Sequence, residues 1–316
     1  MRANVCLILP FLLGGLCSCD APPEEESPRD LPFAAAPLVP SQYLTIDGLQ
    51  IAVYESGGHK GPGVLLLHGN TSSADAFARI LKASKLTKRR VVAIDLPGYG
   101  NSDDAEAYDV ATFTSVIAQA AVQLDVDDGV MVGWSLGGDF LLQAAHLLPD
   151  VKGYFLFGTA PVGGGPPALS PFLTPAESYA GVTTQYGFVA DLTNGQIDDY
   201  VEAFFRPGWF AIPEFFYEDG YRTDPGTRQA VLTAASGLDP SFVAEVPVVQ
   251  GLDVPVALLH AQNDAFVRLD YLQAIAPGIP QLWQGKVIVV PGSGHAMQWE
   301  RPLVFEVLLE AFLADL

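Results

Sequence analysis

The spacing of hydrophobic positions along the chain changes after an N-terminal hairpin. Over residues 43–55, apolar and polar residues alternate on both sides of Asp47-Gly48, which predicts two antiparallel strands joined by a tight turn. Beyond it, short and nearly continuous apolar runs indicate strands that are covered on both faces. These runs are residues 64–67, 91–94, 130–132, 154–157, 254–260 and 286–290.

Stretches with helical spacing separate these runs, at residues 74–81, 111–124, 136–148, 269–275 and 303–312. Alternation of strands and helices calls for a parallel sheet with right-handed crossovers. The sequence therefore predicts an α/β fold, a mostly parallel sheet flanked by helices, with residues 41–160 and 252–316 forming its core.

Residues 161–251 interrupt this alternation. The segment has a Gly/Pro-rich entry and no clean strand periodicity, and it holds 14 of the 33 aromatic residues, seven of them within 204–217. An apolar insertion ahead of a late strand reads as a cap over a pocket, with these aromatics as its walls. A second small core that packs the same aromatics inward is the alternative.

The N-terminus has the pattern of an export signal. Arg2 precedes an apolar run, residues 5–16, that is too short for a transmembrane helix. The following Leu-Cys-Ser-Cys resembles a bacterial lipobox, which implies a signal peptide at 1–18 and lipid on Cys19. Residues 19–40 are rich in Pro and Glu and predict an extended tether. We expect a protein held in the cell envelope through Cys19; a soluble secreted or periplasmic protein is the alternative.

Charge and cysteine placement exclude several kinds of chemistry. There are 36 acidic against 16 basic residues, a net charge of −20. Such a surface repels phosphates, which argues against nucleic-acid binding and against any membrane contact other than the anchor. All three cysteines lie within the first 19 residues, and no His-rich ligand cluster is visible. The body therefore offers no thiol nucleophile, and we expect no metal and no cofactor.

A candidate nucleophile stands between a predicted strand and a predicted helix. Gly133-Trp134-Ser135-Leu136-Gly137 has the G-x-S-x-G pattern, and its strand–turn–helix context is the one that makes this pattern informative. Glycines two residues before and after the serine permit the sharp turn. The helix N-terminus adds free N–H groups where an oxyanion would form.

The serine needs a base, and the base needs an orienting carboxylate. His295 lies in a Gly-rich loop between the last predicted strand and the last helix, where an imidazole can reach across the sheet. Asp264 follows the strand at 254–260, again at a carboxyl end. The order Ser135, Asp264, His295 along the chain is that of an α/β-hydrolase.

An oxyanion hole requires two N–H groups. Leu136, directly after the serine, supplies one, and Asn70, in the His-Gly-Asn loop after residues 64–67, supplies the other. His68 in the same loop is expected to brace it rather than to act as a base. Trp134, beside the serine, is expected to contact the substrate.

Taken together, these residues resemble the α/β-hydrolase superfamily across residues 43–316, and within it N-acyl-homoserine lactonases. The resemblance rests on the blocks HGNTSSADAF, DLPGYGNSD, GWSLGG, NDAFVRLD and GSGHAMQWERP. It implies a Ser135–His295–Asp264 triad, with Asp264 where a lactonase of this group carries Glu.

The function expected from these features is hydrolysis of a small neutral acyl ester or lactone by a serine carboxylesterase or lactonase that forms an acyl-enzyme. One alternative is an aminopeptidase of the proline-iminopeptidase type, in which Asp198, Asp199 and Glu202 of the cap would grip a substrate ammonium group. The other is a non-catalytic ligand-binding protein with a hydrolase fold.

Overall fold

The computed structural model describes residues 36–58, 63–83, 88–166 and 170–316. The predicted signal peptide, Cys19 and most of the tether lie outside these ranges. No helix in the described part of the chain combines the length and the hydropathy that crossing a bilayer requires.

The core is an eight-stranded sheet in the order β1-β2-β4-β3-β5-β6-β7-β8. Strand β2 pairs antiparallel with β1 and β4, and the remaining pairs are parallel. Asp47 and Gly48 both have positive φ (52° and 87°), as a tight hairpin turn requires. The strands are β1 (Gln42–Ile46), β2 (Leu49–Gly57), β3 (Val64–Leu67), β4 (Arg90–Ile94), β5 (Val130–Trp134), β6 (Gly153–Phe157), β7 (Val256–Ala261) and β8 (Ile288–Val290).

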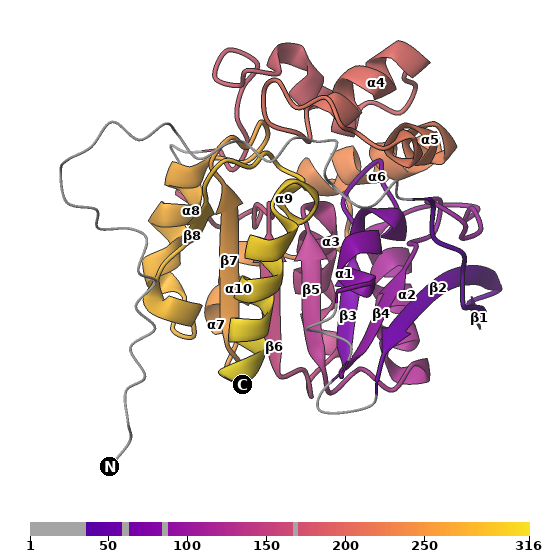
Figure 1. The fold of residues 1–316 in the computed structure, drawn as a ribbon, viewed down its shortest axis with the longest axis vertical. Helices are drawn as coiled ribbons and strands as arrows, with labels where there is room; N and C mark the ends of the chain where they lie inside the picture. Colours follow the sequence, from indigo (N-terminus) through magenta and orange to yellow (C-terminus); the bar gives the residue numbers. More distant parts are fainter. Residues whose placement is uncertain (1–35, 59–62, 84–87, 167–169) are drawn as a thin grey trace, which may run out of the picture. The chain divides into compact units, whose positions relative to one another are not determined.

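Helices cover both faces of the sheet (Figure 1). One face carries η2 (Ala74–Phe77), α1 (Ala78–Leu81), α8 (Leu269–Ile275), α9 (Met297–Glu300) and α10 (Pro302–Ala314). The other carries α2 (Val110–Gln123), α3 (Leu136–Ala144) and α7 (Glu245–Gly251), and the short helices η3 (Ala145–Leu147), η5 (Ala276–Gly278) and η6 (Trp283–Gly285) complete the core. The predicted class, a mostly parallel sheet flanked by helices, is confirmed.

Strand β6 shows why the apolar runs are continuous. Phe155 and Phe157 point into the layer shared with α10, whereas Tyr154 and Leu156 point into the layer shared with α3. Side chains of a strand alternate between faces, and both faces here are buried, so every position is apolar.

Between β6 and β7 the chain forms η4 (Gly181–Phe188), α4 (Asn194–Glu202), α5 (Glu214–Arg222) and α6 (Pro225–Ala235) before α7. Thr193 and Gln196 form a capping box at the start of α4, and Asp224 caps α6 with Pro225 in its first turn. Helices α4 and α5 lie beyond the carboxyl ends of β5 and β7 (Figure 1). The insertion therefore stands over the edge of the sheet at which loops from several strands meet.

The aromatic cluster at 204–217 does not form pocket walls. Phe204, Phe205, Phe215 and Phe216 are fully buried in the core, and the rings of Phe215 and Phe216 lie 5.3 and 5.6 Å from that of Trp299. This packing removes four large rings from water and so stabilises the folded protein. These residues pack inward, as the alternative expects, but they join the core on one face of the sheet rather than forming a second core of their own.

Candidate active site

Ser135 occupies a strained turn between β5 and α3, with φ 52° and ψ −124°. The glycines around it are required by space: a Cβ on Gly133 would come within 2.4 Å of Gly138 Cα, and one on Gly137 within 2.4 Å of the Leu67 carbonyl oxygen. The Ser135 N–H donates to the Phe157 carbonyl at 2.9 Å. A left-handed backbone at a serine is costly and is typical of functional sites, where the surrounding structure holds it.

Asp264 and His295, 31 residues apart, meet through a 2.8 Å contact between Asp264 Oδ2 and His295 Nδ1. The other carboxylate oxygen accepts the backbone N–H groups of Phe266 (2.8 Å) and Val267 (3.0 Å), which fixes its orientation. Burial by itself would raise the pKa of Asp264, but the charge and hydrogen bond of His295 hold it below its ordinary value. The structure thus places an ionised carboxylate against the imidazole.

The His295 imidazole lies close to the turn that carries Ser135. A Cβ added to Gly158 would come within 2.8 Å of His295 Cε1, and Gly158 directly follows Phe157, whose carbonyl binds the Ser135 N–H. The ring of Phe266 packs 4.8 Å from the imidazole, centroid to centroid. Together these contacts bring the three predicted triad residues to one edge of the sheet.

Trp134 differs from its expected role. The side chain is completely buried and does not line the cavity. Its Nε1 donates to the His295 carbonyl oxygen at 3.1 Å, and its ring lies 5.7 Å from the imidazole. A residue on a buried strand points into the core rather than into the cavity, so Trp134 supports the histidine loop.

Glu300 also holds this loop, a role that its position in the sequence does not indicate. Its carboxylate accepts the backbone N–H groups of Gly294 and Arg206, the latter at 3.0 Å. Burial raises the pKa of Glu300 to about 7, against the lowering effect of these two hydrogen bonds. A buried acidic residue five positions after the histidine is a weak signal in sequence, because its partner Arg206 comes from a distant segment.

The loop that contains Asn70 lies beside the serine: a Cβ on Gly69 would be 3.2 Å from Ser135 Cβ. The Asn70 side-chain amide donates to the Gly187 carbonyl at 2.7 Å. Its backbone N–H is therefore the group that this loop can offer to an oxyanion, together with that of Leu136. His68 is buried and contacts backbone groups of Gly69 and Leu96 through its two ring nitrogens, consistent with a bracing role.

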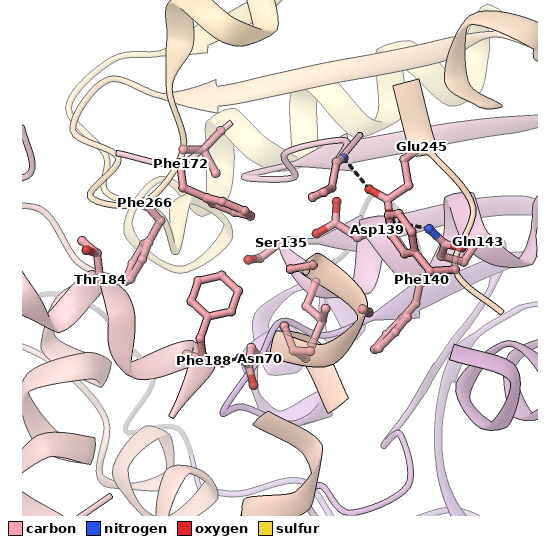
Figure 2. Close-up of a pocket in the computed structure, with 18 of the residues that line it drawn as sticks. Asn70, Ser135, Asp139, Phe140, Gln143, Phe172, Thr184, Phe188, Glu245 and Phe266 are labelled. Atoms are coloured by element: carbon pink, nitrogen blue, oxygen red, sulfur yellow. Dashed lines mark hydrogen bonds between the residues drawn. The ribbon is translucent and has the colours of Figure 1, made fainter. Parts of the chain in front are cut away.

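A cavity opens above Ser135. In Figure 2, the rings of Phe172, Phe188 and Phe266 lie on one side of the serine, and Asp139, Gln143 and Glu245 lie on the other. Most of the wall is apolar. Asp198, Asp199 and Glu202 are not part of it.

Within residues 36–58, 63–83, 88–166 and 170–316, no three His, Cys, Asp or Glu side chains are grouped so that they could hold a metal ion.

Comparison with known proteins identifies the family of the chain. A family model described as the alpha/beta hydrolase fold matches residues 62–302, and the chain belongs to this family. AB hydrolase superfamily protein YisY of Bacillus subtilis is 26% identical over 82% of this chain and 93% of its own length.

Solved structures give the same result. The N-acyl homoserine lactonase AidH, crystallised with N-butanoyl homoserine, is similar with a TM-score of 0.76 and 28% identity, covering 87% of this chain and 96% of its own. An esterase of Exiguobacterium antarcticum shares the fold, with a TM-score of 0.70 at 20% identity, covering 86% of this chain and 99% of its own.

Proposed function

We propose that this protein is a serine hydrolase that cleaves neutral carboxylic esters or lactones through an acyl-enzyme. The observation that carries the proposal is the position of Ser135, held at φ 52° at the base of a mostly apolar cavity, next to the loop of the hydrogen-bonded Asp264–His295 pair. This combination of a strained serine and an oriented imidazole supports catalysis rather than ligand binding alone.

Each side chain has one role in this mechanism. Ser135 Oγ attacks the carbonyl carbon while His295 takes its proton, and Asp264 keeps the imidazole in the correct orientation and stabilises its charged form. The negative oxygen that develops is stabilised by the backbone N–H groups of Leu136 and Asn70. The alcohol leaves with the proton from His295, and a water molecule activated by the same histidine then releases the acid.

The cavity supports a neutral acyl substrate. Its wall is mostly apolar, and the insertion at 161–251 carries 11 acidic and 3 basic residues, which disfavours anionic groups. Similarity to AidH, whose structures contain N-acyl homoserine ligands, makes N-acyl-homoserine lactones the first lactones to test. No observation favours the aminopeptidase alternative through Asp198, Asp199 and Glu202, since these residues do not line the cavity.

A hydrolysis screen tests the proposal. Purified protein and its Ser135→Ala variant are compared on p-nitrophenyl esters, N-acyl-homoserine lactones and proline anilides. We expect turnover of the esters, the lactones or both by the wild type, and none by the variant. Turnover of the anilides alone would contradict the proposal.

We also propose that the chain is exported and anchored to the cell envelope by lipid on Cys19. The support is the apolar run at 5–16, the Leu-Cys-Ser-Cys that follows it, and the Pro/Glu-rich segment after Cys19. Mass spectrometry of the mature N-terminus tests this: a lipid-modified Cys19 as the first residue is expected. An unmodified terminus or cleavage elsewhere would refute it.

A further inference from the structure

The polar side of the cavity contains two carboxyl groups that the proposed mechanism does not use. Asp139 lies in the first turn of α3, one helical turn after Ser135, and Glu245 begins α7. Both line the cavity together with Ser135, and Figure 2 shows Asp139 between Ser135 and Glu245. The Asp139 N–H donates to the Ser135 carbonyl oxygen at 3.3 Å, so the two residues are one hydrogen-bonded turn apart, and both side chains border the space in which a substrate of Ser135 would bind.

Both carboxyl oxygens of Glu245 accept hydrogen bonds from within the protein. One carboxyl oxygen accepts the Gln143 side-chain amide at 2.8 Å, and the other accepts the Val162 N–H at 2.7 Å. Gln143 is itself fixed by the backbone of Val243, from which it accepts a hydrogen bond (3.0 Å) and to which it donates one (2.8 Å). Glu245 is therefore held in a fixed position beside Asp139.

Asp139 differs from Glu245 in its hydrogen bonds. Its carboxyl group lies close enough to that of Glu245 for each of the two groups to shift the pKa of the other. Its Oδ1 is enclosed and receives no hydrogen bond from any described residue, although the nearby Ala160 N–H contributes to stabilising the ionised carboxyl. Asp139 as a whole is partly exposed and lines the cavity, so its carboxyl group can still accept a hydrogen bond from a bound ligand.

The pair is also poorly suited to carry two charges. Burial raises the pKa of Glu245 to about 8, and burial together with the charge of Glu245 raises the pKa of Asp139 well above its ordinary value. None of the groups that shift these two values is basic. At neutral pH the pair thus holds at least one proton, so it carries at most one negative charge and can still accept hydrogen bonds.

We propose that Asp139, supported by Glu245, is a specificity-determining subsite that accepts a hydrogen bond from a neutral N–H or O–H group of the substrate near the scissile carbonyl. This inference rests on the proposed ester or lactone hydrolysis at Ser135. A neutral donor is favoured over an ammonium group, because an ammonium would have to give up its hydration in a mostly apolar cavity. The substrate class is then an ester or lactone with an amide or hydroxyl group close to the reacting carbonyl.

Two methyl esters that differ in a single group test the subsite. Methyl N-hexanoylglycinate carries an N–H where methyl 4-oxononanoate carries a CH₂, and the rest of the two molecules is the same. For the wild type we expect kcat/KM to be at least about tenfold higher for the amide, because a site built around a hydrogen bond rejects an analogue that lacks the donor.

Variants assign this preference to Asp139. Asp139→Leu, which keeps the branching at Cγ but removes both oxygens, is expected to bring the ratio close to one. Asp139→Asn can donate its amide to Glu245 and keep a carbonyl acceptor, so it should retain most of the preference. Asp150→Leu, at an exposed aspartate beyond the end of α3 and η3, is the control and should keep the wild-type ratio.

Several results would overturn the subsite: equal turnover of the two esters by the wild type, a ratio that Asp139→Leu leaves unchanged, or faster turnover of the cationic methyl 6-aminohexanoate. Dissociation constants of the two esters for Ser135→Ala protein separate this inference from the proposed function. A binding preference for the amide without turnover by the wild type would support the subsite and contradict the hydrolase. Turnover of both esters without any preference would do the reverse.

Discussion

Gly158 offers a direct test of where His295 must sit. The residue has φ +58°, and a Cβ there would lie 2.8 Å from His295 Cε1 and 3.0 Å from His295 Nδ1. Ordinary contact begins at 3.4 Å, so in Gly158→Ala the imidazole must move by at least about 0.6 Å, against its hydrogen bond to Asp264. A misplacement of this order typically costs about 10²-fold in rate.

The chain provides a matched control at Gly285. This glycine has φ +65°, lies on the surface, and would place a new Cβ in open space. Both alanine variants therefore carry a similar backbone penalty of about 1–2 kcal/mol. Only Gly158→Ala adds the collision with the imidazole.

Urea unfolding and kcat/KM on p-nitrophenyl hexanoate are the two assays. We expect both variants to lose stability, Gly285→Ala to keep its activity, and Gly158→Ala to lose about 30- to 100-fold in kcat/KM. A Gly158→Ala protein whose activity lies within about threefold of the Gly285→Ala control would refute the assignment of His295 as the base.

Three further predictions follow from the site and its surroundings. Asp264→Asn should keep the fold but lower kcat by about 10⁴, because an amide orients the wrong tautomer of His295; near-normal turnover in a stopped-flow assay would point to another carboxylate. In an apolar cavity each added methylene contributes about 0.8 kcal/mol, so kcat/KM should rise from acetyl to hexanoyl esters; a preference for acetyl would mean that the cavity is closed. Burial raises the pKa of Asp219 to about 8, above its value in the unfolded chain, so the folded protein binds this proton more tightly. The free energy of unfolding of the wild type should therefore fall as pH rises from about 4 to 8, and this group contributes up to about 1.4 kcal/mol per pH unit. Urea unfolding at pH 5 and pH 8 should show a shallower fall for Asp219→Asn, and an equal fall would contradict this.

Local patterns account for what could be predicted from sequence. The strand at 64–67 and the helix at 269–275 have the predicted bounds, because a fully apolar run between turn residues and an amphipathic run of helical spacing are both local signals. The elbow at Ser135 is equally local, since its glycines and its strand–turn–helix context fall within a few residues.

Long-range packing accounts for what could not be predicted. The sequence predicts that Trp134 is a pocket residue because it adjoins Ser135. In the structure, side-chain alternation along β5 directs Trp134 into the core, against His295. The pairing of Asp139 with Glu245 joins α3 to α7, at the end of the insertion. In the sequence, this pairing is indicated locally only by an aspartate within an otherwise apolar helix. Such pairs depend on how the insertion folds back onto the core, which no local periodicity encodes.

Covalent labelling of Ser135 tests the central claim most directly. A fluorophosphonate reacts with a serine that is activated by a neighbouring imidazole, and peptide mapping by mass spectrometry locates the adduct. We predict one adduct, on Ser135, that is lost in both Ser135→Ala and His295→Ala proteins. Absence of labelling in the wild type, or an adduct that persists in the Ser135→Ala protein, would contradict the account.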